Sequence, residues 1–230
     1  YSLIKKEINT YFSSPIAYLV IGVFLSLNGL VLWVFKEDFN ILNTGFADLN
    51  PFFYLAPWIL IFLIPAITMK SFAEEFNSGT IEILKTTPLT NWKIVLGKFF
   101  AALVLVLTAL LPTLSYVYTI YQLGNPVGNF DIGSIMGSYF GLALLASVYI
   151  AIGLFTSTLS KSQIVAFMIS VLSCLFLCFA FDEFALFFND KSLYIEQFGI
   201  LEHYKSVRRG VVDSRDLVYF ISISFFFLFI

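Results

Sequence analysis

The sequence predicts an all-α integral membrane protein with six transmembrane helices. Of its 230 residues, 59% are hydrophobic and only 12% are charged, whereas charged residues make up about a quarter of an ordinary soluble domain. The apolar residues gather into long runs, and an α-helix needs a run of about 20 apolar residues to cross a bilayer. Most charged residues fall between these runs. These observations predict a single transmembrane domain over residues 1–230.

Five apolar runs are long enough to span a bilayer, and a sixth begins near the end of the sequence. The third run contains Pro112, which should kink the helix or end it early. The sixth run, from Leu217, is too short to span on its own, so we expect it to be truncated here and to continue in the native protein. The expected spans are 16–35, 52–69, 94–121, 134–158, 162–181 and 217–230.

Lysine and arginine residues indicate the orientation, because cytoplasmic segments of membrane proteins carry an excess of them. With a cytoplasmic N-terminus, the inside segments hold more basic than acidic residues, and the first two outside loops contain one Lys and no Arg. The third outside segment, 182–216, argues against this orientation because it is rich in Lys and Arg. We expect the N-terminus to be cytoplasmic, since the first helix and the short loops usually dominate.

Ionisable residues are nearly absent from the five complete runs. Lys98, near the start of the third run, is counted with the inside segments, and the rest of these runs contain no Asp, Glu, Lys, Arg or His. Ion-coupled carriers usually need such groups within the membrane, so the sequence argues against an ion-driven carrier. The formal net charge of −2 gives no reason to expect a nucleic-acid partner.

Residues that could support catalysis or bind a metal are few. His203 is the only histidine, which argues against a zinc site or a His-based triad, and we expect it to be an exposed polar residue. Cys174 and Cys178 lie four positions apart in an apolar run, and we interpret them as packing residues rather than a redox pair. Lys98 stands where a phosphate-binding loop would end, but Phe99 replaces the Ser or Thr that such a loop needs. We therefore expect no metal site, no cofactor and no ATP hydrolysis in this chain.

The segment between the second and third runs, 70–93, predicts an amphipathic helix at the cytoplasmic face. Phe72 and Phe76 recur at helical spacing, and polar residues fall between them. An amphipathic helix that binds a membrane surface usually carries Lys and Arg on its polar face. This face instead carries three acidic residues, Glu74, Glu75 and Glu82. Because anionic headgroups would repel them, the pattern favours a protein partner; the alternative is a solvated connector helix without a partner.

A longer motif runs through the same loop: Glu75-x-x-x-Gly79-Thr80-x-Glu82-x-Leu84, then Thr87-Pro88-Leu89 and Trp92-Lys93-x-x-x-Gly97-Lys98. These residues resemble the cytoplasmic loop of ABC-2-type transporter permeases. The number of spans and the placement of the loops agree over essentially the whole chain. The later stretch 207–220 resembles the segment before the last span in the branch that includes gliding-motility permeases of the GldF type.

The resemblance implies a permease subunit that couples ATP hydrolysis in a separate nucleotide-binding subunit to export or mechanical work across the bacterial inner membrane. ATP and Mg would be bound by that partner, and a second permease would complete a homo- or heterodimer. Gliding-motility envelope proteins and membrane lipid are further implied partners, and segment 182–216 would hold short helices near the outer surface. The implied coupling residues are Glu74, Glu75, Gly79, Thr80, Glu82 and Leu84.

A different reading of the chain is a membrane enzyme or scaffold that acts on lipid or glycan at the outer face, using acidic residues of segment 182–216. The cytoplasmic loop distinguishes this hypothesis from the permease hypothesis, because an outer-face enzyme or scaffold has no need of a rigid coupling segment.

Three glycines at four-residue spacing open the fourth run. Gly133, Gly137 and Gly141 form a small-xxx-small face that lets another helix approach closely. The approaching helix could belong to a second permease or to the same chain, and the sequence leaves both open.

Overall fold

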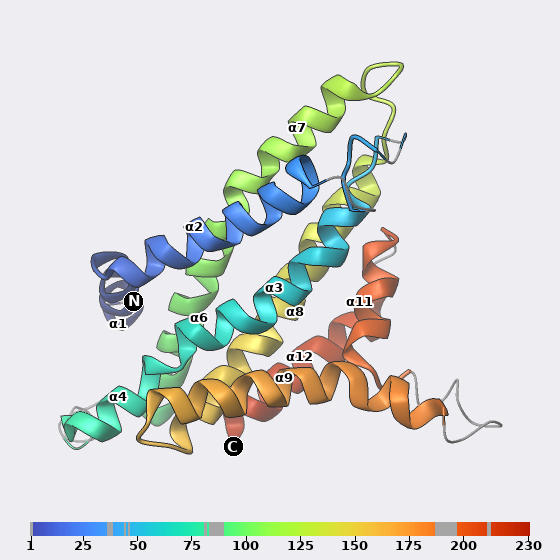
Figure 1. The fold of residues 1–230 in the computed structure, drawn as a ribbon. Coiled ribbons are helices and arrows are strands. Elements are labelled where there is room, and N and C mark those ends of the chain that lie inside the picture. Colours follow the sequence, from blue (N-terminus) through green and yellow to red (C-terminus); the bar gives the residue numbers. More distant parts are fainter. Residues whose placement is uncertain are drawn as a thin grey trace.

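Helices make up all of the regular structure in the described part of the chain. The computed structural model describes residues 2–35, 39–43, 45, 47–80, 82, 90–186, 197–210 and 213–230. In chain order the elements are α1 (Ser2–Ser13), α2 (Pro15–Gly29), the π-helix η1 (Leu30–Val34), α3 (Asn50–Thr68), α4 (Lys70–Ser78), α6 (Asn91–Leu110), the 3-10 turn η2 (Leu111–Thr113), α7 (Leu114–Leu123), α8 (Ile132–Thr158), α9 (Gln163–Leu186), α11 (Ile200–Arg208) and α12 (Ser214–Phe229). Figure 1 shows α4 and the tip of α7 at opposite ends of the bundle.

Five helical stretches among the described residues are long and apolar enough to cross a membrane. They are Pro15–Val34, Asn50–Ser78, Asn91–Leu123, Ile132–Thr158 and Gln163–Phe181. Each overlaps one of the five complete runs that the sequence predicts, and the second continues past the predicted end at residue 69 to Ser78. The predicted class, an all-helical integral membrane protein, is therefore confirmed.

Side-chain caps explain where two of these spans begin. Ser14 precedes α2 and accepts a hydrogen bond from a backbone N–H of the first turn at 3.4 Å, and Pro15 suits the first helical position. Asp131 precedes α8, and its carboxylate accepts hydrogen bonds from the backbone N–H groups of Gly133 and Ser134 at 2.9 and 3.2 Å. Both spans start where a polar side chain satisfies their first backbone donors.

Pro112 interrupts the third span without ending it. A proline within a helix removes a backbone donor and clashes with the preceding turn. Here the path passes through the 3-10 turn η2 and continues as α7, and Figure 1 shows the change of direction between α6 and α7. Of the two outcomes that the sequence allowed, a kink and an early end, the kink is the one observed.

The N-terminal helix α1 was not predicted from the sequence. Its side chains Leu3, Tyr11 and Phe12 pack against the hydrophobic core, whereas Lys5 and Lys6 are exposed. The helix is therefore amphipathic and lies across the start of α6. A Cβ on Gly97 of α6 would lie 2.8 Å from a methyl carbon of Leu3, so glycine at that position permits the close approach of α1.

The sixth predicted span is the shorter helix α12, which is not one of the five stretches above. Its 16 residues rise about 24 Å at 1.5 Å per residue, less than the roughly 30 Å of a hydrocarbon core. Phe225 and Phe229 of α12 pack against Trp92 at the start of α6, and Phe227 contacts Phe155 near the end of α8. The end of α12 therefore lies at the same end of the bundle as the start of α6 and the end of α8. A complete sixth span stays a prediction.

Helix α8 is the centre of the bundle. In its most apolar stretch of 18 residues, 72% of the residues are buried, whereas in the corresponding stretches of the first and fifth spans 28% are buried. Helix α8 also contacts α3, α4, α6, α9, α11 and α12. Gly153 of α8 lies against Thr68 of α3, so that a Cβ added to Gly153 would lie 2.9 Å from the Thr68 Cβ. This approach holds the end of α3 against α8.

The glycine face of α8 packs within the same chain. A Cβ on Gly137 would lie 3.0 Å from the Cα of Gly210, and one on Gly141 would lie 2.9 Å from Val207 Cγ1. Between them, Ser138 donates a hydrogen bond to the Arg208 carbonyl at 2.9 Å. Gly133 is exposed, and among the described residues a Cβ added there would meet the Asp131 carboxylate that caps the same helix. Gly137 and Gly141 therefore serve the packing of α11 on α8, one of the two alternatives left open by the sequence.

Replacing Gly153 with alanine should destabilise the protein by about 1–3 kcal/mol, because the added methyl group overpacks the contact between α8 and α3. Thermal unfolding of the detergent-purified protein measures the effect. Gly22→Ala is the matched control, since no heavy atom of the described residues lies within 4 Å of the added Cβ. Equal unfolding temperatures for the two variants would contradict the close contact at Gly153.

Candidate functional site

The helical path of the second span continues beyond α3 into α4. Met69 is the only residue between the two helices; its backbone is α-helical, and its N–H donates to a carbonyl four residues earlier at 2.8 Å. Phe72 and Ala73 of α4 are buried, whereas Glu74 is exposed. The segment predicted to be amphipathic is therefore a direct extension of α3 that rests on the bundle by its apolar face.

Gly79 ends α4 in the left-handed backbone conformation, with φ at 71°. No heavy atom of the described residues would meet a Cβ there, so the backbone conformation, and not crowding, favours glycine. The hydroxyl groups of Thr80 and Ser78 form a hydrogen bond at 2.9 Å. Thr80 and Glu82 are exposed, and Leu84 lies outside the described residues.

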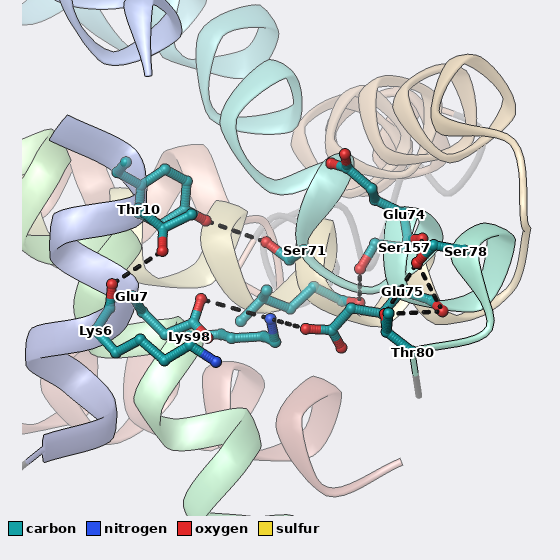
Figure 2. A network of polar contacts seen from close by, with 12 residues as sticks. Lys6, Glu7, Thr10, Ser71, Glu74, Glu75, Ser78, Thr80, Lys98 and Ser157 are labelled. Carbon is teal, nitrogen blue, oxygen red and sulfur yellow. Dashed lines mark hydrogen bonds and ion pairs between the residues drawn. The ribbon is translucent and has the colours of Figure 1, made fainter. Parts of the chain in front are cut away.

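A buried lysine joins α4 to two other helices. Lys98 of α6 donates a hydrogen bond to Glu75 Oε1 of α4 at 2.7 Å, and its ammonium group lies 3.5 Å from Glu7 Oε2 of α1. Figure 2 shows Lys98 between the two carboxylates. The ammonium group also lies 5.2 Å from the centre of the Phe72 ring, a cation–π contact that adds to its stabilisation.

Burial makes this cluster sensitive to the loss of any member. Lys98 is 4% exposed, and a charge removed from water is tolerated only when it is paired. Glu75 Oε2 is buried and has no hydrogen-bond partner among the described residues, so Lys98 provides the main compensation for that carboxylate. The three side chains act as a single electrostatic contact among α1, α4 and α6.

A second polar contact lies beside this cluster. The hydroxyl groups of Tyr11 in α1 and Ser71 in α4 form a hydrogen bond at 3.1 Å. Burial raises the pKa of Tyr11 to about 12, with the Glu7 charge adding to the effect and the Ser71 hydrogen bond opposing it. Tyr11 therefore stays a neutral hydroxyl at physiological pH, and it gives α1 a further contact with α4.

The structure separates the acidic residues that the sequence treated as one polar face. Glu75 points into the bundle and pairs with Lys98, whereas Glu74 and Glu82 are exposed. The sequence places Lys98 with the inside segments, and the structure shows that its side chain is buried between α1 and α4. The carboxylate partners of Lys98 lie 23 and 91 positions away along the chain. In the sequence, only the place of Lys98 within an apolar run indicated that its side chain is buried.

His203 is not the exposed residue that the sequence predicted. Its Nδ1 lies 2.6 Å from Asp216 Oδ1, which joins α11 to α12. The imidazole ring stacks on Tyr219, with ring centres 3.9 Å apart. The prediction failed because the contact depends on how α11 packs against α12, which the spacing of His203 and Asp216 along the chain does not show. No group of three His, Cys, Asp or Glu residues in the described ranges could hold a metal ion.

The arrangement defines a polytopic membrane protein whose second span extends into an amphipathic helix held by buried charges. A family profile described as ABC-2 family transporter protein matches residues 5–214. The chain therefore belongs to the ABC-2 family of transporters and is a membrane-spanning permease subunit of an ABC transporter. A search of curated proteins found no match.

Lys98→Met should lower the free energy of unfolding by about 1–3 kcal/mol, because it leaves the half-buried Glu75 carboxylate without its cation. Thermal unfolding in detergent measures the loss, and Lys93→Met, at an exposed position in the first turn of α6, is the control. Adding Glu75→Gln to Lys98→Met should restore part of the stability. An unfolding temperature equal to that of the control would show that the ion pair does not stabilise the fold.

Proposed function

We propose that α4 and the turn that follows it dock on the nucleotide-binding subunit and transmit its motion to the membrane helices. The observation that carries this proposal is the direct continuation of α3 into α4. A helix transmits a displacement along its axis, whereas a flexible loop absorbs it. ATP binding and hydrolysis in the partner would then bias the spans between two arrangements.

The buried cluster supports this role because it ties the docking helix to its neighbours. Lys98 connects α4 to α6 and to α1, and the hydrogen bond between Tyr11 and Ser71 lies alongside. A force applied to α4 therefore acts on the first, second and third spans together. Without these contacts α4 could bend at Met69 while the spans stayed in place.

The exposed acidic residues supply a docking surface. Glu74 and Glu82 are exposed and form no ion pair with any described residue. Carboxylates at the edge of an interface steer the approach of a basic partner and favour the correct partner over others. Leu84, which the family resemblance also assigns to coupling, lies beyond the described part of this segment.

The remaining parts of the proposal follow from the family and the sequence. The family implies an ABC ATPase partner and often a second permease. We propose that this partner binds ATP and Mg and that the chain itself does not hydrolyse ATP. The α4 end would face the bacterial cytoplasm, in agreement with the excess of lysine in the inside segments. Membership of the gliding-motility branch stays a prediction of the sequence.

Glu82→Lys should abolish recovery of the nucleotide-binding subunit when the tagged full-length protein is purified from its native membrane and analysed by mass spectrometry. The reason is charge reversal on an exposed residue, which leaves the fold intact. Glu183→Lys makes the same reversal at an exposed position on α9 and should leave recovery unchanged. Equal recovery of the ATPase subunit with both variants would overturn the docking assignment.

A further inference from the structure

A groove of about 410 Å³ opens between α1, the start of α2 and α4, beside the buried lysine cluster. Figure 2 shows Lys6 and Thr10 of α1 on one side and Ser71 and Glu75 of α4 on the other. Its volume lies within the range of about 300–1,000 Å³ that is usual for small-ligand sites. The groove is therefore large enough for a molecule of small-ligand size.

Positive and negative side chains lining the groove are equal in number: Lys6, Lys70 and Lys98 against Glu7, Glu74 and Glu75. The buried cluster already pairs Lys98 with the carboxylates of Glu7 and Glu75. Lys6, Lys70 and Glu74 form no ion pair with any described residue. The groove thus offers a ligand two ammonium groups and one carboxylate, and such a lining suits a ligand that carries both signs of charge.

The position of the groove indicates the source of that ligand. Ile16, in the first turn of α2, and Ile67, near the end of α3, form its apolar side. Both residues stand where an apolar span meets a charged segment, which is the level of lipid headgroups. Leu19, one turn along α2 from Ile16 and 63% exposed, extends the apolar surface into the span.

We propose that this groove binds a phospholipid whose headgroup carries a phosphate and a primary ammonium group. Lys6 and Lys70 bind the phosphate, since ammonium–phosphate contacts are charge-assisted hydrogen bonds. Glu74 binds the ammonium group, and it disfavours a headgroup that is only anionic. The acyl chains leave past Ile16 along α2. The site shares Glu74 with the proposed docking surface, but its test uses the purified chain alone and does not depend on binding of the ATPase subunit.

Native mass spectrometry of the delipidated full-length protein tests the site, with phosphatidylethanolamine and phosphatidylglycerol added separately. We expect wild type to bind phosphatidylethanolamine at least fivefold more tightly than phosphatidylglycerol. The double variant Lys6→Gln, Lys70→Gln should weaken phosphatidylethanolamine binding about tenfold. Glu74→Gln should remove the preference between the two lipids, because it removes the partner of the ammonium group.

The matched control is the double variant Lys5→Gln, Lys93→Gln, which removes the same charge from exposed positions that do not line the groove. It should bind both lipids as wild type does. Equal binding by the two double variants, or an unchanged preference in Glu74→Gln, would overturn the proposal. Glycerophosphoethanolamine, which lacks acyl chains, should not compete at equal concentration; equal competition would mean that the groove binds a soluble phosphate ester instead of a lipid.

Discussion

The close approach of neighbouring helices to α8 is the constraint on which the other contacts depend. Lipid chains are as apolar as the helix surfaces, so packing and small residues, and not the hydrophobic effect, bring membrane helices together. Gly153 admits Thr68 of α3, while Gly137 and Gly141 admit α11. The first of these contacts fixes the end of α3, and α4 starts two residues after Thr68. The orientation of α4 is therefore set by a glycine on a different span.

The spans could be predicted because length and hydropathy are local properties of the sequence. The caps at Ser14 and Asp131 then placed their starts within two residues of the predicted boundaries. Helix α1 could not be predicted in this way, because its many polar residues lower the hydropathy of the segment although a short apolar stripe, which includes Leu3 and Phe12, packs on the core. The amphipathic segment after the second span was predicted from the spacing of its phenylalanines, but its junction with α3 needed the backbone at Met69.

The residues of the candidate site also divide into those whose placement follows from the local sequence and those whose placement depends on another helix. Exposure of Glu74 and Glu82 follows from their place on a helical face, which the sequence pattern contains. The inward position of Glu75 does not, because it depends on Lys98 in another helix. Similarly, the contact between His203 and Asp216 depends on how α11 packs against α12. A pattern within one segment predicts which face is polar, but it cannot predict which charge finds a partner across helices.

The buried cluster and the neighbouring groove are linked through shared residues. Glu7, Glu75 and Lys98 line the groove and also hold α1, α4 and α6 together. Any displacement of α4 away from α1 would separate these charges and change the shape of the groove. Consider two arrangements, one with α4 against α1 and one with α4 displaced from it. A ligand that binds the first more tightly than the second stabilises the first by that difference in binding free energy. The lipid at this boundary would therefore influence how readily α4 moves, even though it touches neither ATP nor the transported substrate.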